Sequence, residues 1–251
     1  MKDKSGRNIN YLRISVTDKC NFRCRYCMPD PVPDVEHEEI LRYEEILRIC
    51  EAAVRLGIRK FKITGGEPLV RKGCVDFMRR LKETDGVETV TLTTNGMFVK
   101  EHIDEFKHMG LDGINISLDT LDRKQFHRLT GTDGVDAVVD AVAACVSAGL
   151  KTKINSVLLS ETKSQILRLA HLAQEMPVDV RFIEVMPIGF GRFEKGPTED
   201  AVLQILQAEY PDLAYRRDVR GNGPAVYYGS SLLQGYIGFI AANTHRFCDE
   251  C

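Results

Sequence analysis

Three cysteines stand close together near the start of the 251-residue chain, in the order Cys20-Asn-Phe-Arg-Cys24-Arg-Tyr-Cys27. Three thiolates on one short loop can bind three irons of a [4Fe–4S] cubane and leave the fourth iron without a protein ligand. The amino and carboxylate groups of S-adenosylmethionine (SAM) can fill that position, and an electron delivered to the sulfonium then releases an adenosyl radical. The spacing therefore predicts a cluster that cleaves SAM.

A structural zinc site is the alternative interpretation of these cysteines, because zinc usually takes four nitrogen or sulfur ligands. His37 or His102 could supply the fourth ligand. The spacing of three and two residues on one loop is unusual for zinc, so we favour the iron–sulfur cluster.

A glycine pair follows the second predicted strand, in Thr64-Gly65-Gly66-Glu67-Pro68. Glycines let the backbone approach a ligand closely, and their carbonyl oxygens can accept hydrogen bonds from an ammonium group. Taken alone, the motif also fits a plain turn between a strand and a helix.

The cysteine spacing, the aromatic Tyr26 before the last cysteine and the glycine motif together make the sequence resemble the radical SAM superfamily. Four further segments resemble the GTP 3′,8-cyclases of molybdenum cofactor biosynthesis: LRISVTD (12–18), TTNG (93–96), NISLD (115–119) and RFIEVMP (181–187). The resemblance covers essentially the whole chain. It implies a lyase that converts GTP to (8S)-3′,8-cyclo-7,8-dihydroguanosine 5′-triphosphate, the first step of molybdopterin synthesis.

The resemblance also implies roles for single residues. The positions that contact SAM in the family are Tyr26, Gly66, Ser117 and Met186. The positions that contact the GTP substrate are Arg13, Lys62, Thr93 and Lys153. Lys62 stands where the relatives carry Arg, so a point charge replaces a forked donor there.

The physical chemistry of a triphosphate agrees with this assignment. Its negative charges need cationic partners, and Arg13, Lys62, Lys153 and Arg181 all lie on predicted strands. Each of these residues taken alone could also be a solvated charge at a strand edge. Their positions on alternating, inward-facing sites favour the binding role.

Strand-like and helix-like segments alternate up to about residue 186. We predict strands at 11–16, 60–64, 89–93, 113–118, 152–158 and 180–185, and helices at 42–56, 75–83, 101–108, 135–148 and 164–175. Six β/α units in a row predict an α/β fold with a parallel sheet, and ligands beyond the carboxyl ends of its strands. This pattern fits either a curled open barrel or a doubly wound sheet. The family resemblance implies an incomplete (β/α)6 TIM-like barrel of the radical SAM type.

The pattern changes after Met186. A helix at 198–209 and β-like runs at 225–228 and 235–241 predict a C-terminal, partly antiparallel extension that packs on the core. We therefore divide the chain into a radical SAM partial barrel at 1–190 and an extension at 191–251.

The extension ends in a second cysteine motif, the pair Cys248 and Cys251. In the family, such a pair and a third cysteine over a dozen residues later bind a second [4Fe–4S] cluster. The resemblance implies that the pair binds metal and supplies half of that site. The third cysteine, and the basic segment that follows the pair in relatives, have no counterpart in these 251 residues, so assembly of a second cluster is left open. A pair without further ligands is an exposed dithiol that oxidises to a disulfide.

The composition is that of an ordinary soluble protein, with 43% hydrophobic and 28% charged residues. A net charge of −2 gives no general attraction to nucleic acid or to an anionic membrane, so we expect neither partner. The sequence contains no signal-like apolar start and no run of ~18 apolar residues, which predicts a cytoplasmic protein. Cys50, Cys74 and Cys145 stand alone in helix-like sequence and are expected to be buried structural thiols.

Two other functions are kept open. One is a radical SAM enzyme that modifies peptides or proteins, and the other is a non-catalytic protein that binds SAM and an iron–sulfur cluster. Besides GTP, the expected partners are an electron-donor protein and, with the oligomeric state left open, a second copy of the chain in a homodimer.

Overall fold

The computed structural model describes residues 3–4, 6–28, 37–217, 221 and 223–245. A nine-stranded sheet runs through them in the order β1-β2-β3-β4-β5-β6-β9-β8-β7. The strands are β1 (Tyr11–Ser15), β2 (Lys60–Thr64), β3 (Thr89–Thr94), β4 (Gly113–Ser117), β5 (Thr152–Leu158), β6 (Asp179–Glu184), β7 (Ala214–Arg216), β8 (Val226–Gly229) and β9 (Ile237–Ile240).

Strands β1 to β6 are parallel and follow one another in chain order. All six predicted strands are therefore confirmed, with bounds that differ by one residue at most at either end. Among the described strands, β1 and β7 lie at opposite ends of the sheet and do not pair with each other, so the barrel is open. The fold predicted from the family resemblance, an incomplete (β/α)6 barrel, is confirmed.

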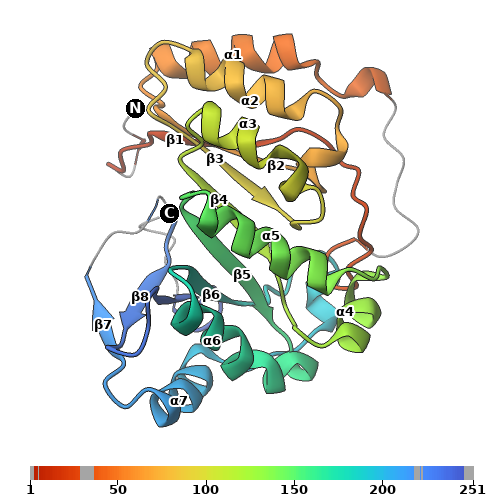
Figure 1. The fold of residues 1–251 in the computed structure, drawn as a ribbon. Coiled ribbons are helices and arrows are strands. Elements are labelled where there is room, and N and C mark those ends of the chain that lie inside the picture. Colours follow the sequence, from red (N-terminus) through yellow and green to blue (C-terminus); the bar gives the residue numbers. More distant parts are fainter. Residues whose placement is uncertain (1–2, 5, 29–36, 218–220, 222, 246–251) are drawn as a thin grey trace.

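Seven α-helices accompany this sheet within the described residues. They are α1 (Tyr43–Arg55), α2 (Cys74–Glu83), α3 (Ile103–His108), α4 (Arg123–Thr130), α5 (Val135–Ser147), α6 (Ile166–Glu175) and α7 (Glu199–Glu209). Figure 1 shows them following the outer side of the curved sheet, from α1 and α2 at one end to α6 and α7 at the other. None of the helices in the described part of the chain is both long and apolar enough to cross a membrane.

The C-terminal strands continue the sheet instead of packing on the core as a separate layer. Strand β9 pairs with β6 in parallel, whereas β8 and β7 follow in antiparallel pairing. The partly antiparallel character of the extension is thus as predicted, but its attachment is different. Pairing with β9 satisfies the backbone groups along the edge of β6, which would otherwise be open. The boundary at residue 190 stays a prediction.

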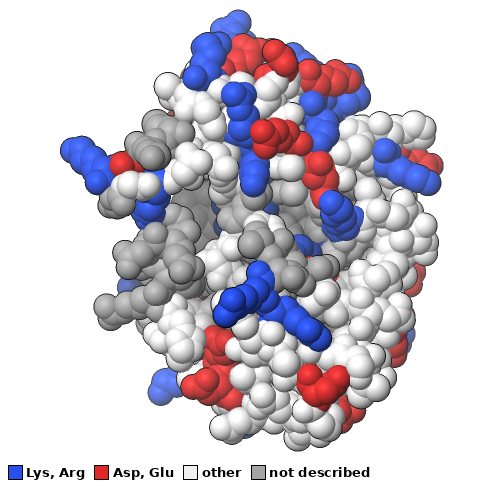
Figure 2. Space-filling model, turned by 90° about the vertical axis from the view of Figure 1, so that its left-hand side faces the viewer, with Lys and Arg blue, Asp and Glu red and all other residues white. Residues whose placement is uncertain are grey.

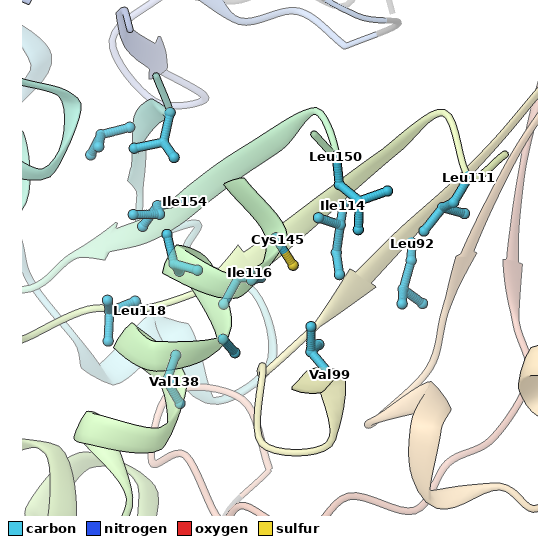
Figure 3. Close-up of a cluster of buried hydrophobic side chains, with 14 of the residues drawn as sticks. Leu92, Val99, Leu111, Ile114, Ile116, Leu118, Val138, Cys145, Leu150 and Ile154 are labelled. Carbon is cyan, nitrogen blue, oxygen red and sulfur yellow. The ribbon is translucent and has the colours of Figure 1, made fainter. Parts of the chain in front are cut away.

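Side chains alternate between the two faces of the parallel strands. Every second residue of β3 and β5 is buried, and these residues are apolar for the most part. Figure 3 shows Leu92, Ile116 and Ile154 from three neighbouring strands near Val138 and Cys145 of α5, in a cluster of buried side chains. The remaining positions of these strands turn to the inside of the open barrel and are mostly polar.

The three cysteines outside the clustered motifs all lie in the apolar layer. Cys50, Cys74 and Cys145 are buried and carry free thiols. Burial raises the pKa of Cys145 to about 12, so its thiol stays protonated and unreactive. The prediction that these cysteines are buried structural thiols is confirmed.

Replacing Ile116 by alanine tests how much this apolar layer contributes to stability. The side chain is completely buried, so Ile116→Ala should lower the free energy of unfolding by about 2–5 kcal/mol through lost burial and a cavity. Leu56→Ala is the control, because Leu56 is 62% exposed and its loss should cost much less. Urea denaturation of both variants measures the difference, and equal costs would contradict the assignment of the core.

Candidate functional site

The polar face of the sheet places residues from five strands side by side. Arg13 of β1 lies in register with Lys62 of β2. Thr93, Asn115 and Lys153 are successive neighbours across β3, β4 and β5. The four residues predicted to contact GTP therefore lie on one face of the open barrel.

Arg181 of β6 is a further polar residue on this face, and it is almost completely buried. Its Nε donates to Oδ1 of Asn155 over 2.9 Å, and its Nη2 donates to Oδ1 of Asn115 over 2.8 Å. Asn155 also lies in register with Ser117 of β4, one of the positions predicted to contact SAM. The two amides hold the guanidinium in a fixed position, which suits it to bind an anion.

Positive charge accumulates on this face strongly enough to affect Lys62. The pKa of Lys62 is lowered to about 7, mainly by burial and then by the charges of Arg181, Arg13 and Lys153. Three cationic side chains from three other strands thus lie near enough to repel the ammonium of Lys62. Figure 2 shows Lys and Arg side chains around a hollow in the molecular face that it views. A polyanionic ligand would relieve the repulsion.

Lys153 has partners within the protein. Its Nζ lies 3.0 Å from Oδ2 of Asp179 and donates to the hydroxyl of Tyr227 over 2.9 Å. The ammonium also lies 4.8 Å from the centre of the Tyr227 ring. Tyr227 comes from β8, so the C-terminal extension contributes directly to the polar face.

The loop with the three N-terminal cysteines follows β1 and is attached to α4. Phe22 is buried and packs edge-on against Phe126 of α4, with 5.6 Å between the ring centres. The backbone N–H of Arg23 donates to the carbonyl oxygen of Thr130 at the end of the same helix, over 2.7 Å. These contacts fix the loop beyond the carboxyl end of β1, where the fold predicts ligands.

The thiols of this loop are close enough to influence one another. Burial raises the pKa of Cys24, and the carboxylate of Asp119 and the neighbouring Cys27 and Cys20 raise it further. Burial likewise raises the pKa values of Cys20 and Cys27. Three thiolates at this position therefore need a strong positive charge beside them, and the irons of a cluster supply one. The donor set fits the predicted [4Fe–4S] cluster.

The glycine pair lies directly against the cysteine loop. A Cβ atom on Gly66 would lie 2.4 Å from the carbonyl oxygen of Lys19 and 2.7 Å from that of Asp18. The N–H of Gly66 donates to the carbonyl oxygen of Thr17, and that of Glu67 donates to Lys19, each over 2.8 Å. Glycine is therefore required by the loop itself, in addition to any ligand, which the sequence motif alone did not indicate.

Asp119 connects Tyr26, one of the positions predicted to contact SAM, to strand β5. The hydroxyl of Tyr26 donates to Oδ2 of Asp119 over 2.6 Å, and the N–H of Val157 donates to Oδ1 over 2.7 Å. Asp119 follows Ser117 by two residues, beyond the end of β4. Burial raises the pKa of Asp119 to about 6, although both hydrogen bonds oppose the rise. Met186 lies in the loop after β6, where 47% of its surface is exposed.

The sequence also offered Cys248, Cys251, His37 and His102 as metal ligands. Cys248 and Cys251 lie outside the described residues, so their assignment to a second cluster stays a prediction. His102, considered as a zinc ligand, lies 3.0 Å from the carboxylate of Glu105. In the described part of the chain, no group of three His, Cys, Asp or Glu side chains lies close enough to hold a single metal ion. A cubane cluster binds each thiolate at a different iron, so this finding does not bear on the cysteine loop. Nothing is described of the His37 side chain.

Known proteins resemble both parts of the chain. Residues 14–173 match the model of the radical SAM superfamily, and residues 178–251 match that of Molybdenum Cofactor Synthesis C. A GTP 3′,8-cyclase of Clostridium perfringens is 43% identical over 253 residues, which cover 100% of this chain and 78% of that protein. The chain belongs to the GTP 3′,8-cyclase family. A cyclase of Heliobacterium modesticaldum is 42% identical over 260 residues, covering 100% of this chain and 79% of that protein.

Solved structures support the fold of this cyclase-family chain. SuiB of Streptococcus suis, solved with bound S-adenosylmethionine, matches with a TM-score of 0.66 and 20% identity. The match covers 80% of this chain and 47% of SuiB. Methylornithine synthase (PylB) matches with a TM-score of 0.63 and 18% identity over 78% of this chain and 61% of PylB. Enzymes of the radical SAM superfamily, to which this chain belongs, use SAM and an iron–sulfur cluster as cofactors.

Some polar residues of the site were not assigned a role from the sequence. Asp119 stands in a quoted motif, but its contact with Tyr26 joins residues 93 positions apart in the sequence. Asn155 follows Lys153 by two residues, so strand parity alone could have placed it on the polar face. Tyr227 carried no such signal, because the pairing of β8 was not predicted.

Replacing Gly66 by valine tests the contact between the glycine pair and the cysteine loop. Since a Cβ would collide with the Lys19 and Asp18 carbonyls, Gly66→Val should displace the loop and reduce SAM affinity at least about tenfold. Iron content after anaerobic reconstitution should fall as well, while circular dichroism shows a retained fold. Gly223→Ala is the control, since nothing lies within 4 Å of its added Cβ. Unchanged iron content and SAM affinity in Gly66→Val would contradict this account.

Proposed function

We propose that the chain converts GTP to (8S)-3′,8-cyclo-7,8-dihydroguanosine 5′-triphosphate by radical SAM chemistry. The observation that carries the proposal is the convergence of Arg13, Lys62, Lys153 and Arg181 on the polar face of the barrel. This face adjoins the loop that holds three cysteine thiols. A site with both features suits a polyanionic nucleotide and a cluster-bound cofactor together.

Cys20, Cys24 and Cys27 would hold the N-terminal [4Fe–4S] cluster, and Tyr26, Gly66, Ser117 and Met186 would bind SAM. When bound, the cluster and SAM would supply an adenosyl radical able to take the C3′ hydrogen of GTP. Bonding of C3′ to C8 would leave the unpaired electron on guanine, and one further electron from the reductant and a proton would complete the 7,8-dihydro product. The Tyr26–Asp119 hydrogen bond joins the cysteine loop to the end of β4, next to Ser117. This contact would hold the cysteine loop and the end of β4, which together would form the SAM site, at fixed positions relative to each other.

Arg13, Lys62, Thr93 and Lys153 would bind GTP, with the charges directed at its triphosphate. Arg181 would contribute charge to the same region from a fixed position between Asn115 and Asn155. Charged donors at fixed positions orient an anion with little loss of conformational freedom, which helps to align the ribose with the radical.

The cyclase is favoured over the two alternative functions by the comparisons. Relatives named GTP 3′,8-cyclase share 38–43% identity with essentially the whole chain. SuiB, also solved with its precursor peptide SuiA, shares 20% identity and therefore supports the fold alone. The second cluster at Cys248 and Cys251, an electron-donor protein, a homodimer and a cytoplasmic location stay predictions.

The reaction products test the proposed function directly. Anaerobic incubation of the reconstituted protein with GTP, SAM and a reductant should yield 5′-deoxyadenosine and the cyclised nucleotide. Cys20→Ala should lose cluster iron and both products, because it removes one of the three thiolate ligands. Cys145→Ala is the matched control, since Cys145 is a buried free thiol of helix α5 to which no role at the site is assigned.

Each alternative gives a different product pattern. A peptide-modifying enzyme would form 5′-deoxyadenosine but no cyclised nucleotide, and a non-catalytic protein would form neither. Normal SAM cleavage by Cys20→Ala would refute the assignment of the cysteine loop.

Binding of the nucleotide should be linked to protonation of Lys62. Its pKa is about 7 without ligand, and a bound triphosphate should raise that pKa because it stabilises the ammonium form. Binding therefore takes up a proton, and GTP affinity should fall as pH rises from about 7 to 9, by up to about tenfold per pH unit. Isothermal titration calorimetry in buffers of different ionisation enthalpy measures the uptake.

Lys62→Arg should remove this pH dependence, because arginine stays protonated throughout the range. Lys100→Arg is the control, since Lys100 is exposed and pairs with Asp140 of helix α5. A pH-independent affinity in the wild-type protein would show that Lys62 does not face the triphosphate.

A further inference from the structure

Glu67 of the glycine motif is completely buried, and both oxygens of its carboxylate are occupied by the protein. Oε1 accepts from the hydroxyl of Thr94 over 2.8 Å and from the N–H of Leu69 over 3.0 Å. Oε2 accepts from the backbone N–H of Asn95 over 2.6 Å. Its hydrogen-bonding capacity is therefore directed to the turn that follows β3.

The bond to Oε2 of Glu67 fixes the backbone at Asn95, which is 7% exposed, and the rest of its amide contacts orient the side chain. Its Oδ1 accepts from the N–H of Met97 over 3.1 Å, which determines the orientation of the amide. The Nδ2 group then points to the cysteine loop. It donates to Oδ1 of Asn21 over 2.7 Å and to Sγ of Cys20 over 3.9 Å.

Cys20 also accepts a hydrogen bond from a second donor, the backbone N–H of Phe22, over 3.3 Å. Hydrogen bonds to ligating sulfurs help to set the reduction potential of an iron–sulfur cluster. An N–H group that points at sulfur stabilises the more negative, reduced state more than the oxidised state. In a buried position, where water screens little, this effect is stronger than at the surface.

We propose that Asn95, oriented by Glu67, is a positioning residue that raises the reduction potential of the cluster bound at Cys20. The inference rests on the proposed function, because it requires a [4Fe–4S] cluster on the cysteine loop. It assigns Asn95 a role apart from substrate binding. Its side-chain hydrogen bonds go to Asn21, Cys20 and Met97 and not to the cationic residues.

The consequence concerns the electron that starts the reaction. A higher reduction potential makes the cluster easier to reduce. A given electron donor then keeps a larger fraction of the protein's clusters in the reduced state. Loss of the Asn95 donor should therefore slow SAM cleavage with a weak reductant and leave the KM for SAM nearly unchanged.

The test is a redox titration of the reconstituted full chain, followed by electron paramagnetic resonance of the reduced cluster without SAM or GTP. Asn95→Leu removes the N–H donor without adding charge and should shift the midpoint potential to a more negative value. Asn95→Asp keeps the acceptor for Met97 but replaces the amide donor by a carboxylate. It should shift the potential at least as far in the same direction.

Asn21→Ala is the matched control. It removes the hydrogen bond from Nδ2 of Asn95 to the side-chain Oδ1 of Asn21 but leaves the Asn95 donor free to point at Cys20. Its midpoint potential should equal that of the wild type. If Asn21→Ala shifts the potential as far as Asn95→Leu, the position of the loop sets the potential and the proposal is wrong.

The remaining outcomes also decide the question. A wild-type potential in Asn95→Leu overturns the inference while leaving the proposed function intact. A folded Asn95→Leu protein that binds no iron would make Asn95 necessary for assembly, which also contradicts a tuning role. If the wild-type chain itself assembles no cluster, the proposed function fails together with the inference.

Discussion

The strict alternation of side chains along the parallel strands is the constraint on which the rest of the structure depends. One face of β2 to β5 is apolar and lies under the helices, where Phe61, Leu92, Ile116 and Ile154 are completely buried. The other face is polar. In most parallel sheets both faces are buried and apolar, so polar residues at every second position are unusual. They cost stability unless a ligand or other polar groups satisfy them.

The cysteine loop depends on this sheet through a small number of close contacts. The backbone of Gly66 lies against the carbonyls of Asp18 and Lys19, and Phe22 is held by Phe126 of α4. The loop is therefore attached both to a strand end and to a helix. Because β1 leads directly from Arg13 into the loop, the cationic face and the three thiols lie within one continuous region.

The positions of the parallel strands could be predicted because each is a short segment rich in Ile, Val, Leu, Phe or Thr between helix-like segments. Their order in the sheet came from the family resemblance, because the pattern fits both an open barrel and a doubly wound sheet. Strand parity also predicted that Arg13, Lys62, Lys153 and Arg181 share the inward face of the barrel, whereas Thr93 was assigned through the family resemblance. The pairing of β9 with β6 could not be predicted, because a short run such as residues 237–240 does not encode the direction of its neighbour.

The sequence pattern also could not predict contacts between residues that lie far apart in the chain. The hydrogen bond from Asn95 to Cys20 joins residues 75 positions apart, and no periodicity signals such a pair. The lowered pKa of Lys62 depends on its burial and on charges carried by three other strands, so it follows from the assembled sheet. The requirement for glycine at position 66 was predicted from ligand binding, whereas the structure adds a second cause in the cysteine loop.

A crystal structure of the anaerobic protein with SAM and GTP would test the central claim, that the polar face and the cysteine loop form one site. We expect the triphosphate within hydrogen-bonding distance of Arg13, Lys62 and Lys153, and the methionine part of SAM between Gly66 and the cluster. A triphosphate bound on the helix side of the sheet, or a SAM molecule remote from Cys20, Cys24 and Cys27, would contradict the account.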